Sequence, residues 1–157
     1  MEKAWLQAFE KMTYGIYCLT TSHGDKINGM IASWVSQVSY DPPMIMVAVH
    51  PTRYSNHLIR QSGCFALNIL ARSQTDLLGR FKHPDPVIKF SSIQWMKGKK
   101  GCPILKDCVA YMECEVKATY RPGNHTLFIG EVEDAQIFSD SWPLRTSDYA
   151  GVYLGRE

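Results

Sequence analysis

The sequence lacks the apolar stretches that membrane-spanning and secreted proteins carry. No segment of the chain approaches the ~18 consecutive apolar residues that a transmembrane helix needs. The N-terminal segment 1–12 also has no apolar centre of the kind found in a secretory signal. We therefore expect a cytoplasmic protein with no membrane partner.

Neither a long basic face nor paired metal ligands are present. The net charge is +2 at pH 7 and the basic cluster at 97–100 is short, so nucleic acid is not an expected partner. The five cysteines form no CxxC pair, and no metal site is expected. Cys18, Cys64 and Cys114 fall in apolar strand patterns, which predicts buried, reduced thiols. No spacing supports a catalytic pair of cysteine and histidine, although the residue types allow one.

Two further absences narrow the fold class. The chain has no GxGxxG motif and no regular alternation of strands and helices, which disfavours a Rossmann fold. It has no repeat, linker or low-complexity segment, so we expect a single domain over residues 1–157. The apolar periodicity predicts about seven strands and a few short helices. A mainly β protein built as a barrel is therefore expected.

The expected elements follow from this periodicity and from the turn residues between them. Helices are expected over 4–11 and 55–62, with one helical turn over 75–79. Strands are expected over 14–22, 26–40, 44–49, 65–70, 93–96, 109–120 and 125–138. The strand over 26–40 should bend near Gly29 or Trp34, and 44–49, which is apolar on both faces, should be central. The rest of 83–101 is expected to be loop.

Residues 28–70 carry the strongest indication of a ligand site. Small and hydroxyl residues occupy the strand before Trp34, and small side chains let a flat ligand lie close to the backbone. After the apolar strand, loop 51–55 brings Arg53 and hydroxyl groups to a helix N-terminus, which suits a phosphate. Together these features describe a mononucleotide such as FMN. Close strand packing and a helix-capping serine are the ordinary alternatives.

Several motifs extend the pattern along nearly the whole chain. In chain order they are Tyr14-Gly15-Ile16-Tyr17, Thr20-Thr21, Asn28-Gly29-Met30-Ile31-Ala32-Ser33-Trp34, Asp41-Pro42-Pro43, Arg53-Tyr54-Ser55-Asn56-His57, Gly79-Arg80-Phe81 and Gly123-Asn124-His125-Thr126-Leu127-Phe128-Ile129-Gly130-Glu131-Val132. This set resembles the flavin reductase-like family with the FMN-binding split barrel. Within that family it is most similar to the branch of flavoredoxin and archaeal ferric reductase.

The resemblance implies a split β-barrel of the Greek-key type that binds FMN near the interface of a homodimer. Along the flavin ring and ribityl chain it implies Gly29, Met30, Ala32, Ser33 and Trp34. At the phosphate it implies Arg53, Tyr54, Ser55 and His57. At the edge of the ring it implies Phe81, Tyr149 from the tail, and His125 as the catalytic residue.

The chain departs from the family pattern in three places. Many members carry aspartate before the histidine of the HTLF motif, where this chain has Asn124. The tail segment 145–149 lacks a second aromatic residue that some members show. No rubredoxin-like extension with paired CxxC motifs is present, so an electron-transfer partner would be a separate protein.

Ordinary roles are also open for the same residues. Arg53 suits the protein surface, whereas Trp34 and Phe81 suit the core. His125 begins a strand just after a tight turn, where side chains are usually exposed. For these residues the binding role is implied by the resemblance.

The expected activity is hydride transfer from NAD(P)H to FMN, with free flavin or a ferric complex as acceptor. Such a reaction needs stacked rings and no protein nucleophile, in agreement with the lack of a Ser/His/Asp signature. A non-enzymatic FMN electron carrier reduced by a partner protein is the alternative. A small-molecule binding barrel without redox activity is a third class.

Overall fold

The computed structural model describes residues 1–149 and 151–155. Its main feature is a seven-stranded antiparallel sheet in the order β2-β1-β5-β8-β9-β4-β3, beside a two-stranded ribbon, β6-β7. The strands of the sheet are β1 (Tyr17–His23), β2 (Lys26–Ala32), β3 (Val35–Ser39), β4 (Met44–Val49), β5 (Cys64–Ile69), β8 (Ala110–Tyr120) and β9 (Thr126–Ile137). The ribbon consists of β6 (Trp95–Lys97) and β7 (Pro103–Leu105).

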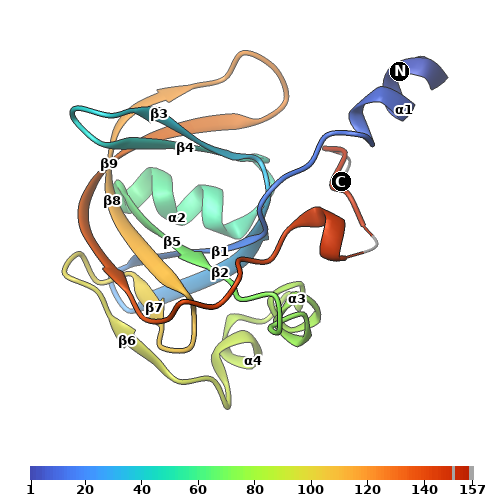
Figure 1. Cartoon of the computed structure of the whole chain (residues 1–157). Helices are drawn as coiled ribbons and strands as arrows, with labels where there is room; N and C mark the ends of the chain where they lie inside the picture. The colour runs from blue at the N-terminus through green and yellow to red at the C-terminus, as the bar shows by residue number, and fades with distance from the viewer. Residues whose placement is uncertain (150, 156–157) are drawn as a thin grey trace.

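The described helices are short. They are α1 (Lys3–Phe9), α2 (Tyr54–Ser62), α3 (Asp76–Phe81) and α4 (Pro86–Phe90), followed by a 3₁₀ turn, η1 (Thr146–Asp148). Helix α1 projects away from the barrel (Figure 1), and none of its residues is buried. Among the described residues, no helix has the length and apolar character needed to cross a membrane.

The sheet rolls into a barrel because its two edge strands are consecutive in the chain. Strands β2 and β3 lie at opposite edges of the sheet, yet only Ser33 and Trp34 separate them. The sheet must therefore curve until its edges approach one another at this corner. The Trp34 carbonyl accepts a hydrogen bond from the Ala48 amide, which fixes the corner to β4. The bend predicted near Trp34 is confirmed, because the expected strand over 26–40 divides here into two.

Helix α2 spans the split between the two edges (Figure 1). Its Asn56 side chain donates to the carbonyl of Val49, at the end of β4. Its Ser55 hydroxyl accepts a hydrogen bond from Asn28 on β2. Gly63 ends the helix in the left-handed conformation at φ 70°, which glycine adopts without steric cost. The helix predicted over 55–62 and its glycine end are confirmed.

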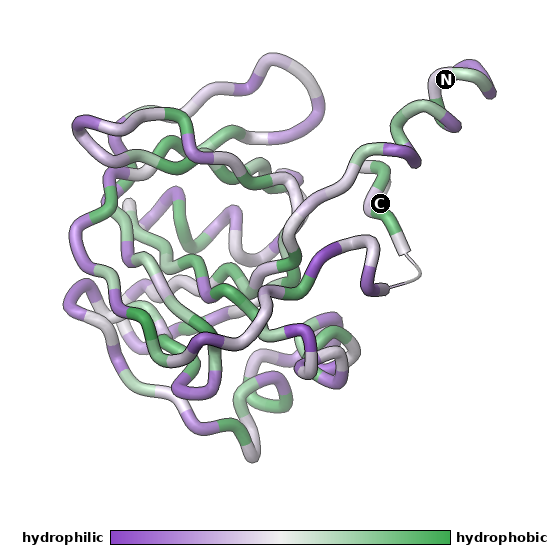
Figure 2. Tube along the Cα trace, viewed as in Figure 1, coloured by the Kyte–Doolittle hydropathy of each residue, from purple (hydrophilic) through white to green (hydrophobic). Residues whose placement is uncertain are grey.

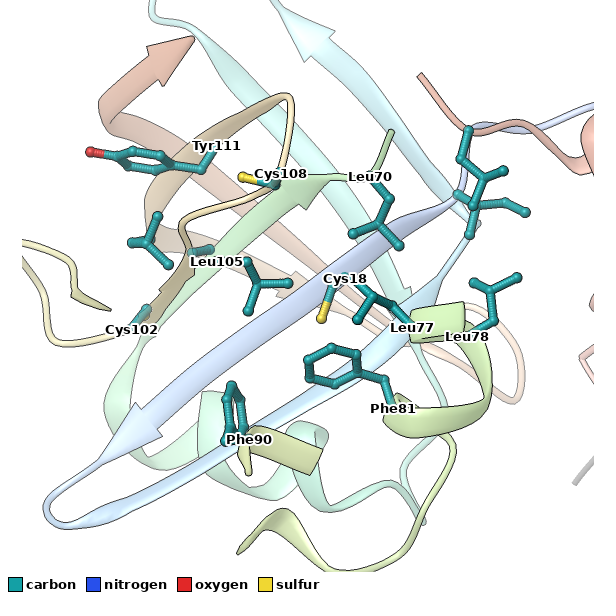
Figure 3. Packing of buried hydrophobic residues seen from close by; sticks show 14 of the residues in the cluster. Cys18, Leu70, Leu77, Leu78, Phe81, Phe90, Cys102, Leu105, Cys108 and Tyr111 are labelled. Carbon is teal, nitrogen blue, oxygen red and sulfur yellow. The ribbon is translucent and has the colours of Figure 1, made fainter. Parts of the chain in front are cut away.

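The core lies on both faces of β1 and β5. Adjacent residues of a strand point to opposite faces, so Cys18 packs outside the barrel while Leu19 packs inside it. Outside, Phe81 of α3 and Phe90 of α4 cover the sheet (Figure 3), and green apolar segments run through the same region in Figure 2. Inside, Phe65 and Phe128 fill the barrel.

The remaining predicted elements agree with the structure in part. Strand β4 is paired on both sides, but only alternate residues of it are buried, so β1 and β5 are the strands enclosed on both faces. The expectation of loop over 83–101, apart from a strand near 93–96, is wrong for α4. That helix has its own local start, because the Asp85 side chain accepts from the Val87 amide and proline follows at the first position. Five residues are too few to show a helical period.

Candidate active site

A cavity of about 330 Å³ opens at the barrel corner where β2 passes into β3. Residues from several parts of the chain surround it: the segment before β1, the end of β2 with the corner, the end of β4, the loop before α2, helix α3 and the C-terminal tail. The predicted ligand residues that line it are Met30, Ala32, Ser33, Trp34, Arg53, Phe81 and Tyr149. The lining residues that sequence reasoning missed are Ile16, Ile31, Ala48, His50, Leu78, Lys82, Thr146, Gly151, Val152 and Tyr153.

Gly29 serves helix packing. A methyl group at this position would lie 2.7 Å from Phe81 Cε1 and 3.2 Å from Phe90 Cζ. The two phenyl rings meet edge to face, with centroids 5.6 Å apart. The small residue therefore lets α3 and α4 approach β2, and through that approach it sets the position of Phe81 on the cavity wall.

The predicted phosphate residues divide into two groups. Arg53 lies on the cavity wall and immediately precedes α2. Ser55 is fully buried, and its hydroxyl accepts from Asn28 Nδ2 at 2.9 Å. His57 is exposed and stacks on Tyr54 with ring centroids 6.5 Å apart. Among the described residues, the structure brings only Arg53 of this group to the cavity.

Lys89 of α4 is a buried cation that sequence reasoning missed. Its ammonium group donates to Asn28 Oδ1 at 3.0 Å and to the Gly29 carbonyl at 2.8 Å. Burial lowers the pKa of Lys89, and the nearby charge of Arg53 lowers it further. Lys89 and Arg53 therefore make the region between β2 and α2 electropositive. A lysine in an apparently polar loop gave no local signal of this burial.

His125 lies in an aromatic cluster under the tail. Its side chain is 5% exposed, so the prediction of an exposed histidine is wrong. The Trp34 ring lies beside it with centroids 4.7 Å apart, and the His50 ring meets it edge-on at 5.2 Å. The tail covers the histidine because the Tyr153 hydroxyl lies 2.8 Å from Nε2.

The hydrogen-bond partners of His125 favour one tautomer of its ring. Its Nδ1 lies 2.8 Å from the amide oxygen of Asn124, which can only accept. In the neutral ring the proton is therefore on Nδ1, and Nε2 accepts from the Tyr153 hydroxyl. Asn124 thus favours the tautomer with the proton on Nδ1.

The tail reaches the cavity through pairing with the segment before β1. The Tyr14 amide donates to the Thr146 hydroxyl, and the Thr146 amide donates back to the Tyr14 carbonyl. Tyr149 then accepts a hydrogen bond from Lys82 at 3.3 Å. The tail carries a further aromatic residue, Tyr153, four positions beyond Tyr149.

The residues of the cavity fit a flat aromatic ligand that carries an anion. Apolar side chains of Met30, Ala32 and Phe81 form a surface for a ring, and Arg53 supplies a cation at its edge. Trp34 Nε1 is buried and has no hydrogen-bond partner within residues 1–149 and 151–155. A ligand with an acceptor edge would satisfy this donor. Over the same ranges, no group of three or more potential ligands could hold a metal ion.

Comparison with known proteins gives relatives over nearly the entire chain. The family model described as "Flavin reductase like domain" matches residues 9–151. A ferric-chelate reductase (NAD(P)H) of Archaeoglobus fulgidus is 30% identical over 155 residues, which cover 96% of this chain and 92% of the relative. A high molecular weight rubredoxin of Moorella thermoacetica is 33% identical, with 95% of this chain and 67% of the relative covered.

A solved structure extends the comparison to three dimensions. The Streptomyces globisporus NADH:FAD oxidoreductase SgcE6, in complex with NAD and FAD fragments, superposes with a TM-score of 0.83 at 25% identity. The match covers 92% of this chain and 87% of that one. The split-barrel architecture predicted from the resemblance is confirmed.

Proposed function

The chain belongs to the flavin reductase-like family, and we propose that it binds FMN in the corner cavity and passes electrons from NAD(P)H to free flavin or a ferric complex. It is an NAD(P)H-dependent oxidoreductase of the flavin reductase type. The main support for this site is that one cavity contains an apolar wall, the buried indole N–H of Trp34, which has no partner within the described residues, and Arg53. Hydride acceptance from NAD(P)H is the chemistry that a bound flavin supplies.

The corner residues are proposed to bind the ring. Met30 and Ala32 leave a shallow apolar surface on β2, and Phe81 closes its far side. Trp34 would donate its indole N–H to an acceptor at the edge of the ring. Exclusion of water by these apolar side chains strengthens each polar contact inside the cavity.

Arg53 is proposed to hold the phosphate. It precedes α2, whose first amide groups and helix dipole favour an anion. Lys89 adds positive charge nearby without lining the cavity, and through Asn28 it orients Ser55 at the same helix end. A site with one short phosphate loop suits FMN better than FAD, whereas the relative SgcE6 was crystallised with FAD fragments.

His125 is proposed to position the nicotinamide. In the tautomer with the proton on Nδ1, the Nε2 atom of His125 is an acceptor. It becomes available to a ligand once the Tyr153 hydroxyl moves away. The carboxamide N–H of NAD(P)H is a suitable donor. Positioning of this kind lowers the barrier by bringing the two rings into a reactive arrangement.

A homodimer is also proposed. Helix α1 exposes the apolar residues Trp5 and Phe9, at 59% and 48% of their surface, and a partner subunit would cover them.

The second functional candidate is an FMN electron carrier served by a separate redox protein. Its support is the similarity to a relative named as a rubredoxin. A cytoplasmic location stays a prediction from the sequence.

Steady-state oxidation of NADH and NADPH in the presence of FMN, FAD and ferric citrate tests the proposal, together with a visible spectrum of the protein as isolated. Turnover by the protein alone supports the reductase. A flavin spectrum without turnover supports the carrier. Absence of binding to both FMN and FAD would contradict both.

A further inference from the structure

Two of the buried cysteines are in contact at the end of the barrel opposite the corner cavity. The Cys102 thiol donates to Cys64 with 3.4 Å between the two sulfur atoms. Cys64 begins β5 directly after the glycine that ends α2, and Cys102 precedes β7. The two positions are far apart in the sequence, so no spacing motif announces the pair. Both cysteines are free thiols.

A buried carboxylate holds the turn that carries Cys102. Glu113 is fully buried on β8 and accepts from the Cys102 amide at 3.1 Å and from the Lys100 amide at 2.9 Å. Gly98 packs so closely on this carboxylate that a methyl group there would overlap its oxygen atoms. The contact between the sulfur atoms is therefore built into the fold. To form a disulfide bond, the two sulfur atoms need to approach by only a little more than about 1 Å, which a side-chain rotation can supply.

The two thiols differ in access and in acidity. Cys64 lines an open depression of about 610 Å³ beside Ser62 and Lys100, whereas Cys102 is fully buried behind it. The hydrogen bond from Cys102 lowers the pKa of the Cys64 thiol. Burial and the negative charge of Glu113 oppose this, whereas the hydrogen bond with Ser62 and the charge of Lys100 add to it. The same contact raises the pKa of Cys102, and burial raises it further. Cys64 is thus the more acidic thiol of the two and the one nearer to solvent, and Cys102 lies behind it.

We propose that Cys64 and Cys102 form a peroxide-reactive dithiol, with Cys64 as the attacking thiol and Cys102 as the resolving one. The Cys64 thiolate attacks one oxygen of hydrogen peroxide, the O–O bond breaks, and Cys64 becomes a sulfenic acid while hydroxide leaves and is protonated to water. Cys102 then attacks the Cys64 sulfur, the S–O bond breaks, and a second water leaves as the disulfide forms. Peroxide gains the two electrons that the two thiols lose. This chemistry lies outside the flavin cavity and goes beyond the proposed activity.

The purified protein, without NAD(P)H, is treated with increasing hydrogen peroxide, and its free thiols are counted after denaturation. We expect the count to fall from five to three and to return with dithiothreitol. Peptide mapping without reductant should find Cys64 linked to Cys102. Unchanged thiols, or a disulfide between any other two cysteines, would overturn the proposal in the wild-type protein itself.

Variants then separate the two roles. In Cys102→Ser the sulfenic acid should persist at Cys64 and be trapped by dimedone. In Cys64→Ser the peroxide-dependent loss of free thiols should slow several-fold. Cys108→Ser is the matched control, because this buried thiol donates to Asn68 and to the Ala110 carbonyl, and the number of free thiols in this variant should fall by two as in the wild type. If Cys64→Ser lost free thiols to peroxide at the wild-type rate, the assignment of Cys64 as the attacking thiol would be contradicted.

Discussion

The hydroxyl of Tyr153 lies 2.8 Å from Nε2 of His125, so the C-terminal tail covers the histidine proposed to receive the nicotinamide. The tail is anchored before this point by its pairing with Tyr14. Beyond Tyr149 it lines the cavity with Gly151 and Val152. A nicotinamide that uses Nε2 must therefore displace Tyr153 first, and part of its binding free energy is spent on that displacement.

Removal of the Tyr153 hydroxyl should make this displacement easier. A hydrogen bond of this kind contributes about 1 kcal/mol, which corresponds to roughly a fivefold change in an equilibrium constant. Tyr153→Phe is expected to lower the KM for NAD(P)H by up to about that factor, with little effect on flavin affinity. Tyr120→Phe, at an exposed position on β8, serves as the control. A KM equal to that of the wild type would show that the tail does not compete with the nicotinamide.

Truncation of His125 should affect both stability and rate. Because the ring is buried against Trp34 and bonded to Tyr153, its loss leaves a void and removes the hydrogen bond between His125 and the Tyr153 hydroxyl. His125→Ala is expected to lower the free energy of unfolding by about 1–3 kcal/mol. Flavin reduction in stopped flow should slow at saturating NAD(P)H, while FMN affinity changes little.

The exposed His57 provides the comparison for this prediction. His57→Ala should keep both the wild-type melting temperature and the wild-type rate, since this residue is exposed and its ring stacks on Tyr54 at the surface. A normal reduction rate in a folded His125→Ala protein would leave His125 with a structural role only.

Local sequence signals predicted the elements that depend on neighbouring residues. Helix α2 shows apolar residues on one face and a glycine at its end, and both are properties of a short segment. The corner at Trp34 was also predicted as a bend. Helix α4 and strand β7 were missed, because elements of five and three residues are too short to display a period.

The binding roles of the site residues stay predictions, and the partners that these residues meet in the fold were not foreseen, for one physical reason. Ser55 matched a phosphate loop, but its partner is Asn28, which lies 27 residues earlier in the chain. Gly29 matched a ligand contact, but it accommodates Phe81. His125 was expected at the surface, and a tail 28 residues later covers it. Residue type indicates what a side chain can bind, whereas tertiary packing decides which partner it meets.

Arg53 offers the most direct test of the phosphate position. A hydrogen bond to a charged group contributes about 1.5–3 kcal/mol, so Arg53→Ala should weaken FMN about tenfold to a hundredfold. Riboflavin, which has no phosphate, should bind with nearly unchanged affinity. Arg60→Ala on the exposed side of the same helix is the matched control. An equal loss of affinity for FMN and riboflavin would argue against a phosphate contact.

The buried Lys89 predicts a pH dependence of stability. Burial lowers the pKa of Lys89 in the folded protein, while in the unfolded chain it titrates near its ordinary value of 10.5. Between these two values the unfolded chain binds more protons than the folded one. The wild-type protein should therefore gain stability relative to a variant without the amine as the pH rises toward 10.5, and this gain should be absent near neutral pH.

Lys89→Met is the informative variant because methionine fills similar space without a titrating group. The difference in melting temperature between wild type and variant, measured from pH 7 upward, should shift in favour of the wild type. Lys97→Met, at an exposed position on β6, is the matched control for the loss of one lysine charge. The buried amine also donates to Asn28 and to the Gly29 carbonyl, so the variant leaves both acceptors unpaired. The stability lost with these two hydrogen bonds is the same at every pH, so it can be told apart from the effect of titrating Lys89. If the difference in melting temperature between wild type and variant did not change with pH, Lys89 would not be held in a low-dielectric environment.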